Sequence, residues 1–389
     1  MTYNEQLITD NKALTDIVAQ FSSAAFLAID TEFMRETTYY PLLCLIQVSD
    51  GTNAVAIDPL ADGLDLTPFW QLLKNEAITK VFHAGRQDLE IFVHLMGELP
   101  TSIYDTQIAA MVCGLGDQVG YDKLVQHYKS IEIDKSSRFT DWSKRPLSDK
   151  QLRYALDDVV HLAEIYPQMI KALEEASRTN WLDEELAVLR DIKIYRPEPE
   201  DMWQKVKIRN AKPVLLNRLK FLASWRETEA QRRNLPRNRL LRDETLLDLA
   251  ASNPKSLKGF DKIRGFPGGA NGKLAAVILT VLQAADAVDK ENWPKAKQHK
   301  RTEKPPQAVI ELLRVLMKDV CEAHQVAPKL LASSDDLEAL ALSDTADIKA
   351  LQGWRFDIFG KPALALKAGK LALSVVDNKL RIVKLEDGA

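Results

Sequence analysis

An apolar run that ends in two acids is the feature that most restricts how this chain can fold. Phe26-Leu27-Ala28-Ile29 is typical of a buried strand, and Asp30 and Glu32 follow it two positions apart. Alternate residues on a strand project from the same face, so both carboxylates are expected to point the same way. The fold must therefore place something beside this strand end that compensates two negative charges.

Further acids are positioned to join this pair. Asp88 lies just past the next apolar run, Lys80-Val81-Phe82-His83-Ala84, at the expected opening of a helix. Tyr154 and Asp158 lie four residues apart in a long helical pattern, which puts both on one stripe of the helix. Asp157 is turned roughly 100° around that helix and is left out of the set. We expect four acids from three elements to converge.

Each of these residues also has an ordinary structural explanation. Asp88 alone is typical of an acid stabilised by the dipole of its helix. A tyrosine and an aspartate four apart on a helix are usually core and surface positions. His83 ends an apolar run and is interpreted as a hydrogen-bonded core residue rather than a ligand. Only the order, spacing and context of the whole set favour a functional site.

Hard divalent cations suit such a cluster. Mg²⁺ and Mn²⁺ prefer oxygen ligands, keep several waters, and are usually held by a few carboxylates plus a substrate phosphate. Two such ions about 4 Å apart activate an attacking water and stabilise the leaving oxygen in phosphodiester hydrolysis. The acids repel one another without metal. The predicted cofactors are therefore two divalent ions, Mg²⁺ or Mn²⁺, and metal dependence should be absolute.

The order Asp-x-Glu, Asp, Tyr-x-x-x-Asp resembles the DEDD superfamily of 3′–5′ exonucleases, in the branch with tyrosine in its third motif. The resemblance implies a ribonuclease H-like α/β domain, with a mixed sheet flanked by helices. It implies that Asp30 bridges both metals. Glu32 and Asp158 would hold the metal that binds the attacking water, and Asp88 would serve the other through water. Tyr154 would orient that water by a hydrogen bond, because an ordinary phenol is protonated at neutral pH.

Three residues of the first motif are the candidate substrate-binding positions. The resemblance implies that Glu32 also touches the 3′-terminal ribose, and Thr31 beside it is a further candidate. Phe33 is expected to stack on the terminal base, since aromatic platforms accept any base; a core position is the open alternative. Residues 136–147 are polar, basic and aromatic, which favours either a loop over a nucleic-acid channel or an ordinary surface loop.

The helix that carries the third motif has clear end signals. Ser148 and Gln151 form a capping-box pattern at its start. The helical pattern continues to Ala176, with a bend or break expected near Pro167. Residues 195–200, Tyr-Arg-Pro-Glu-Pro-Glu, then interrupt it, which predicts the end of the first domain.

Charge is distributed unevenly along the chain, although its net value is only −3. Lys and Arg number 18 against 33 acids in residues 1–202, 23 against 10 in 203–304, and 11 against 12 thereafter. A basic segment of this size suits a polyanion, because its cations neutralise phosphates. The acidic part is expected to gather cations and the basic part to hold nucleic acid. A solvated lysine-rich surface is the alternative for the basic part.

Two helical blocks follow the first domain. The patterns Asn234-Leu235-Pro236 and Val326-Ala327-Pro328 each precede spaced leucines, and each block then has two glycines seven residues apart. Both blocks resemble the HRDC domain, a small helical bundle. The second is degenerate and near neutral. It is either a further RNA-binding unit or a spacer that closes the first block against the catalytic domain, giving a ring-like or funnel-like entrance.

The predicted organisation is thus an α/β exonuclease domain followed by two small all-α bundles. We expect the exonuclease domain at 1–202, the basic HRDC-like domain at 203–292, and the degenerate one at 305–389. Residues 291–307, rich in Lys, Pro and Gln, are predicted to link the two bundles. The segments 371–376 and 380–383 are predicted to form a terminal hairpin.

Over nearly its whole length the arrangement is similar to the bacterial ribonuclease D family. That resemblance implies hydrolysis of RNA from its 3′ end to 5′-monophosphates, with tRNA precursors among the substrates. Two alternatives stay open: a DNA 3′–5′ exonuclease of the same superfamily, and a noncatalytic RNA-binding protein on a dead nuclease fold.

Several partners and locations are disfavoured by the sequence. No segment approaches the roughly 18 consecutive apolar residues of a membrane span, and the start lacks a signal-peptide pattern. The chain is therefore expected to be cytoplasmic, and a monomer is favoured. Cys44, Cys113 and Cys321 lack disulfide or metal-ligand spacing, so all three are expected to be reduced.

Overall fold

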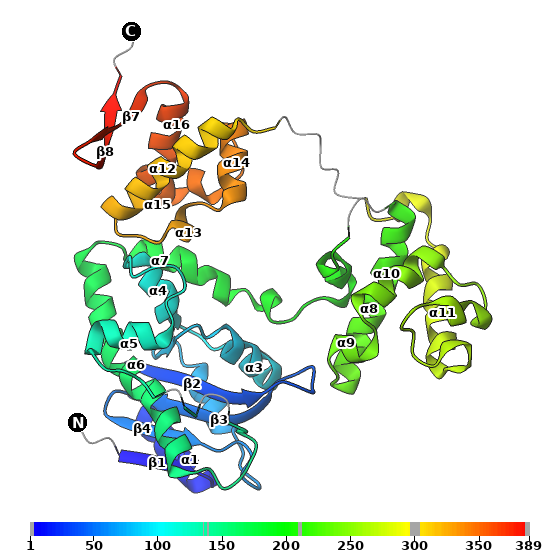
Figure 1. The fold of residues 1–389 in the computed structure, drawn as a ribbon. Helices are drawn as coiled ribbons and strands as arrows, with labels where there is room; N and C mark the ends of the chain where they lie inside the picture. The colour runs from blue at the N-terminus through cyan, green and yellow to red at the C-terminus, as the bar shows by residue number, and fades with distance from the viewer. Residues whose placement is uncertain (1–3, 135, 138–139, 209–211, 296–303, 386–389) are drawn as a thin grey trace.

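The computed structural model describes all residues except 1–3, 135, 138–139, 209–211, 296–303 and 386–389 (Figure 1). Arg138 and Phe139 of the predicted channel loop, and the middle of the predicted linker at 291–307, lie outside the described residues. The described chain forms an N-terminal α/β domain and two helical blocks (Figure 1).

A six-stranded mixed sheet forms the centre of the N-terminal domain, as predicted. Its strand order is β1-β4-β3-β2-β5-β6, and β2 runs antiparallel to β3 and parallel to β5. The central position of β2 puts the end of the first apolar run in the middle of the sheet. The strands are β1 (Asn4–Ile8), β2 (Phe26–Met34), β3 (Leu42–Ser49), β4 (Asn53–Ile57), β5 (Thr79–Phe82) and β6 (Ile103–Asp105).

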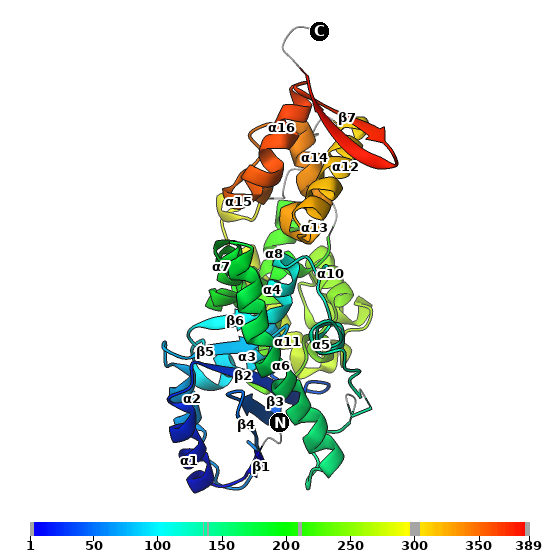
Figure 2. The same cartoon turned by 90° about the vertical axis from the view of Figure 1, so that its left-hand side faces the viewer.

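Helices cover both faces of this sheet. On β4, Ala54 and Ala56 pack toward helix α6, whereas Val55 and Ile57 belong to the larger core on the other face. Figure 2 shows α1 and α2 on one side and the first half of α6 on the other. The helices of this domain are α1 (Asn11–Phe21), α2 (Thr67–Leu73), α3 (Arg86–Met96), α4 (Thr106–Val112), α5 (Tyr121–Lys129) and α6 (Asp149–Glu175).

Helix α6 begins where the sequence predicts. The Gln151 amide donates to the Ser148 hydroxyl at 3.3 Å, and the Ser148 amide donates to the Gln151 side chain at 3.1 Å. Of the bend or break expected near Pro167, the break is wrong, since the helix runs through that residue to Glu175, and the bend stays a prediction. The packing of Ile165, Met169 and Leu173 in the core stabilises the helix across the proline.

The first helical block has a core of its own. Met202 of η3 (Pro199–Lys205) packs with Leu219, Leu246 and Ile278 of three helices. A run of short helices connects α6 to this block: α7 (Thr179–Leu186), η1 (Ala187–Arg190) and η2 (Ile192–Ile194). The block continues with α8 (Pro213–Arg233), α9 (Arg237–Leu240), α10 (Asp243–Ser252), η4 (Leu257–Lys262), η5 (Gly269–Asn271), α11 (Lys273–Asp286) and η6 (Lys290–Asn292).

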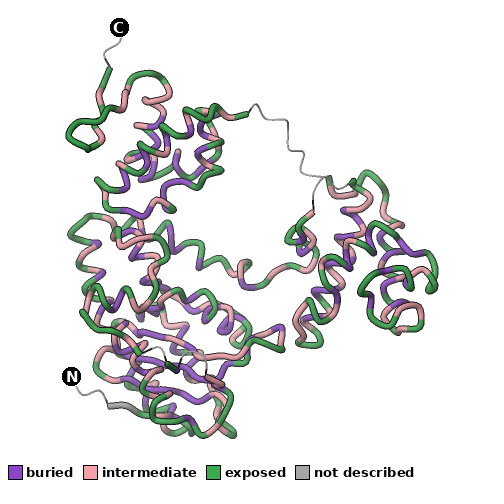
Figure 3. The backbone as a smooth tube through the Cα atoms, viewed as in Figure 1, coloured by how far each residue is buried: buried purple, intermediate pink, exposed green. Residues whose placement is uncertain are grey.

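The second helical block begins, like the first, with a long helix, a one-turn helix and a further helix, and it ends in the predicted hairpin. Asp377 and Asn378 have φ of 51° and 60°, which suits a two-residue turn between β7 and β8. Figure 3 shows the hairpin largely exposed. The elements are α12 (Gln307–Ala323), α13 (Pro328–Leu331), α14 (Ser334–Leu342), η7 (Lys349–Leu351), α15 (Gly353–Arg355), η8 (Phe356–Gly360), α16 (Lys361–Lys367), β7 (Leu371–Val376) and β8 (Lys379–Lys384).

The core of the second block is continuous with the core of the N-terminal domain. The rings of Trp181 in α7 and Trp354 stack with centroids 4.3 Å apart. Arg355 is buried and forms ion pairs with Glu184 and Glu185 of α7. The second block therefore packs directly on the N-terminal domain. Its role as a spacer or as an RNA-binding unit stays a prediction.

Two further expectations concern membranes and cysteines. Within the part of the chain that the structure describes, no helix is both long enough and apolar enough to span a bilayer. Cys44, Cys113 and Cys321 are free in the structure.

Candidate active site

Three of the predicted acids meet at the centre of the sheet. Asp30 and Glu32 project from β2, and Asp158 projects from α6, which packs across that strand. One carboxylate oxygen of each lies within 4.8 Å of the others. The strand spacing of two thus puts both β2 acids toward the helix, and the helix supplies the third.

Asp88 reaches the same region from the first turn of α3. It is buried, and it is outside the group of three mutually close carboxylates. The Thr31 hydroxyl donates a hydrogen bond to it. Thr31 was expected to bind substrate, but its side chain is buried and bonded to Asp88, which makes it a support for that acid.

The acids disfavour one another's ionisation. Burial, followed by repulsion from Asp88, Asp158 and Glu32, raises the pKa of Asp30 well above its ordinary value. Burial, with a smaller effect of Asp157, raises the pKa of Asp158 to about 7, and burial raises that of Asp88 to about 6. A set of oxygen donors with excess negative charge fits hard divalent cations.

Tyr154 faces the same cavity as the acids. The cavity measures about 240 Å³ and is enclosed by residues of β2, α5 and α6 and the segments beside them. Its lining consists of Asp30, His83, Gly120, Tyr121, Asp122, Ile133, Tyr154, Asp158 and Leu162. The Tyr154 phenol and two of the predicted acids, Asp30 and Asp158, therefore share one solvent-accessible space.

Two other rings line this cavity in supporting positions. His83 is hydrogen-bonded at both nitrogens, at 3.0 Å to the Thr106 hydroxyl and 3.0 Å to the Val119 carbonyl, as its interpretation predicted. Tyr121 was missed by the sequence analysis. Its hydroxyl donates to the backbone carbonyl of Asp158 and so ties α5 to α6 beside the acid. No local pattern marks a tyrosine whose partner is a carbonyl in another helix.

Phe33 follows a β-bulge. The pairing of β2 with β3 shifts register between Glu32 and Phe33, which redirects the strand just past the acids. The Phe33 side chain is half-buried and packs against the main core. It therefore combines a core contact with an exposed edge near the site.

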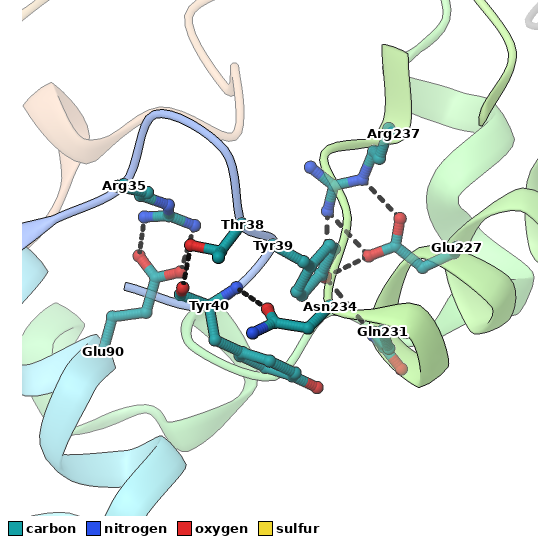
Figure 4. Close-up of polar contacts among 9 residues, drawn as sticks. All are labelled: Arg35, Thr38, Tyr39, Tyr40, Glu90, Glu227, Gln231, Asn234 and Arg237. Atoms are coloured by element: carbon teal, nitrogen blue, oxygen red, sulfur yellow. Dashed lines mark hydrogen bonds and ion pairs between the residues drawn. The ribbon is translucent and has the colours of Figure 1, made fainter. Parts of the chain in front are cut away.

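The loop that follows β2 carries the contact with the first helical block (Figure 4). The Tyr39 hydroxyl donates to Glu227, a buried carboxylate that also receives Arg237 at 2.6 Å. The Tyr40 amide donates to the Asn234 side chain at 2.9 Å. We call these residues the Tyr39 contact. The block is thus attached by polar groups to the loop that continues the acid-bearing strand.

Metal-free protein is expected to lose stability as the pH rises from about 4 to above 7. Burial raises the pKa of Asp158 to about 7, whereas an unfolded aspartate titrates near pH ~3.9. The folded state therefore binds more protons than the unfolded state in this window, so the unfolding free energy falls as pH rises.

Mn²⁺ or Mg²⁺ should offset this loss. The rise in melting temperature on adding Mn²⁺ is expected to be larger above pH 7 than below pH 5, because protons compete for the same oxygens. Thermal melts in EDTA and in Mn²⁺ at both pH values measure it. An equal shift at both would contradict the proposed ligand set.

The chain matches two families along its length. Residues 6–174 match the family described as 3′-5′ exonuclease, and residues 216–282 match the HRDC domain. The second match covers most of the first helical block, so the first HRDC prediction is confirmed.

Full-length relatives are also found. Ribonuclease D of Gluconacetobacter diazotrophicus is 46% identical over 376 residues, which cover 96% of each chain. Ribonuclease D of Zymomonas mobilis is 46% identical over 384 residues, or 98% of each chain. A crystal structure of Escherichia coli RNase D matches this chain with 30% sequence identity and a TM-score of 0.80. That enzyme is described as an exoribonuclease involved in structured RNA processing. The match covers 95% of this chain and 99% of that one.

Proposed function

This chain belongs to the ribonuclease D family of 3′–5′ exoribonucleases, and from that premise we propose how its residues divide the reaction and which RNA it trims. The proposal is that it removes 5′-monophosphates one at a time from 3′ ends, with the trailers of tRNA precursors among its substrates. The observation that carries it is the convergence of Asp30, Glu32 and Asp158 beside a cavity that Tyr154 also lines.

Asp30, Glu32 and Asp158 would hold two divalent ions, with Asp88 at the second through water. When bound, such ions supply an activated water and charge compensation at the leaving oxygen. The Tyr154 hydroxyl would donate a hydrogen bond that orients the attacking water, and our proposal therefore includes membership of the tyrosine branch. Thr31 holds Asp88 in place, in keeping with the hydrogen bond between them.

Glu32 and Phe33 are the proposed contacts to the 3′-terminal nucleotide. Glu32 accepts a hydrogen bond from the terminal ribose, which offers a way to distinguish RNA from DNA through its 2′-hydroxyl. Phe33 presents its exposed edge to the terminal base, an arrangement supported by the bulge that precedes it.

The division into 1–202, 203–292 and 305–389 remains our proposal, with Met202 and η3 contributing to the second unit's core. We propose that the third unit is a degenerate second HRDC domain. The repeated order of elements supports this: a long helix, a residue with positive φ, a one-turn helix and a further helix occur in both blocks. The chain would act as a cytoplasmic monomer on RNA.

Matched RNA and DNA strands test the substrate. A 5′-labelled RNA with an unpaired 3′ extension should shorten stepwise in Mn²⁺ and release nucleoside 5′-monophosphates, whereas the DNA strand should be cut more slowly. A preference for DNA would support the alternative of a DNA exonuclease. No cleavage of either strand by pure protein in Mn²⁺ or Mg²⁺ would favour a noncatalytic RNA-binding protein.

RNA binding should depend on cations of the first helical block. Arg239, Arg242 and Arg264 line a groove of about 910 Å³ together with four acids, Glu36 from the loop after β2 and Asp243, Glu244 and Asp248 of α10. The basic balance of this block and its attachment beside the site favour RNA in this groove. Single-stranded contacts contribute about 0.7 each to the slope of log affinity against log salt.

Replacing Arg239, Arg242 and Arg264 together by alanine is therefore expected to flatten that slope by about 2 and weaken binding. Fluorescence anisotropy at several salt concentrations measures it. The matched control replaces Lys329, Lys349 and Lys361, three exposed cations of the second block. If the slope of log affinity against log salt were the same in both variants, RNA binding in this groove would be contradicted. Deletion of 203–389 is a poorer test, because it would also uncover the core that the second block shares.

A further inference from the structure

A single arginine fixes the segment that precedes α6. We call residues 140–147 the Arg145 strap. The Arg145 guanidinium donates to both carboxylate oxygens of Asp58, at 2.6 and 2.7 Å, and to the Cys44 carbonyl at 2.6 Å. It also donates to the carbonyls of Trp142 and Lys144 within the strap, at 2.7 and 2.8 Å. The strap is thus bonded to β3 and to the end of β4.

The strap places one aromatic ring behind Tyr154. Trp142 is only 2% exposed, and its ring centroid lies 6.1 Å from that of Tyr154 with the planes 32° apart. Leu156, Leu45 and Ala56 belong to the same cluster, between α6 and the sheet. The Gln151 side chain donates to the Thr140 hydroxyl at 3.3 Å, which ties the strap to α6 a second time. The Trp142 ring therefore packs against the ring of Tyr154, the residue that lines the cavity.

Stability alone does not account for this arrangement. Asp58 is 4% exposed, and a buried ion pair roughly balances its desolvation cost against its attraction. What a bidentate arginine and carboxylate do supply is a defined geometry. This geometry fixes Trp142, and Trp142 in turn fixes Tyr154. The Tyr154 hydroxyl must lie within about 3 Å of a water to orient it. A displacement of about 1 Å is enough to cost a large factor in rate.

We propose that Arg145 and Trp142 are positioning residues for the hydrolytic reaction. Arg145, held by Asp58, fixes the Trp142 ring, and that ring fixes the direction in which the Tyr154 hydroxyl enters the cavity. Among the described residues, neither side chain hydrogen-bonds to Asp30, Asp88 or Asp158. The inference rests on the proposed role of Tyr154 in orienting water.

A double-mutant cycle with Tyr154→Phe tests it. Arg145→Lys keeps the charge but loses the bidentate pair, and it is expected to lower kcat about 10- to 100-fold with little change in KM. In the Tyr154→Phe background the same substitution should change kcat much less, because the group that it positions is already gone. Equal factors in both backgrounds, or an unchanged kcat in Arg145→Lys alone, would overturn the proposal.

The cycle also separates this inference from the function on which it rests. A Tyr154→Phe enzyme with unchanged kcat would reject the role of Tyr154 and the inference together. A slow Tyr154→Phe enzyme with additive factors would reject the inference alone. Trp142→Phe is the second variant if Arg145→Lys does not fold, and it should show the same dependence on Tyr154.

Two controls report on the structure of the site. The Mn²⁺ affinity of RNA-free Arg145→Lys, measured by calorimetry, should match that of the unsubstituted chain, because Asp30, Glu32 and Asp158 are not in contact with the strap's arginine. A large loss of affinity would indicate general disruption and contradict a positioning role. Lys144→Ala, at a strap side chain that is 80% exposed, should leave kcat unchanged.

Discussion

The Asp30→Asn variant is expected to lose RNA hydrolysis by about 10³-fold or more, and yet to unfold at a higher temperature in EDTA than the unsubstituted chain. Metal ions supply several kcal/mol of charge stabilisation, and each ~1.4 kcal/mol is tenfold in rate. The same carboxylate is buried and repelled by Asp88, Asp158 and Glu32, so a neutral amide of similar shape removes a cost in the metal-free protein.

Opposite changes in activity and stability distinguish this result from misfolding. Initial rates on 5′-labelled RNA and thermal melts in EDTA measure the two quantities. Asp157→Asn is the matched control, because Asp157 is next to Asp158 but on another face of α6 and outside the cavity lining. Surviving hydrolysis in Asp30→Asn would reject the metal site. If Asp157→Asn lost as much hydrolysis as Asp30→Asn, the assignment of Asp158 rather than Asp157 to the site would be rejected.

The Arg355→Leu variant is expected to lower the free energy of unfolding of the chain by about 3–5 kcal/mol. Arg355 is 4% exposed and forms an ion pair with Glu185, which is also buried. It donates to the Leu330 carbonyl at 2.6 Å and lies 4.6 Å from the Trp354 ring. Removal of the Arg355 guanidinium leaves the Glu185 carboxylate buried without a counter-charge, at the interface between the second block and α7.

Urea unfolding followed by tryptophan fluorescence measures this loss, since Trp181 and Trp354 stack at the joint. Arg314→Leu is the control. Its ion pair with Glu311 in the same block is exposed, and such pairs contribute about 0–1 kcal/mol. Adding Glu185→Leu to Arg355→Leu should restore much of the stability, because replacing both partners of a buried pair is often neutral. If the free energy of unfolding of Arg355→Leu were no lower than that of Arg314→Leu, a core shared by the second block and the N-terminal domain would be contradicted.

Local signals account for what the sequence predicted well. The strand before Asp30 and Glu32 is marked by its apolar run, and the start of α6 is marked by Ser148 and Gln151, which bond within one turn. The terminal hairpin is marked by Asp377 and Asn378, residues that tolerate positive φ. The mixed sheet and the first HRDC domain followed from resemblance, not from periodicity.

What the sequence could not predict depends on partners far apart along the chain. Arg145 and Asp58 are 87 residues apart, and Tyr39 and Glu227 are 188 apart. Neither pair has a spacing that distinguishes it from ordinary surface charge. Thr31 was assigned to substrate for the same reason, since its true partner, Asp88, is 57 residues away. A bend or break was expected at Pro167, and the helix does not break there because tertiary packing outweighs a local propensity.

The two helical blocks are attached to the catalytic domain by unlike chemistry, and this has a consequence for how the enzyme admits RNA. Separation of the second block from the N-terminal domain would expose apolar rings such as Trp181 and Trp354 to water. Separation at the Tyr39 contact would instead expose a phenol, a carboxylate and a guanidinium, which water hydrates readily. Reversible opening is therefore least costly on the basic side. RNA that moves toward the acids would displace the arginine-rich bundle, whereas the other bundle would stay in place as a fixed support.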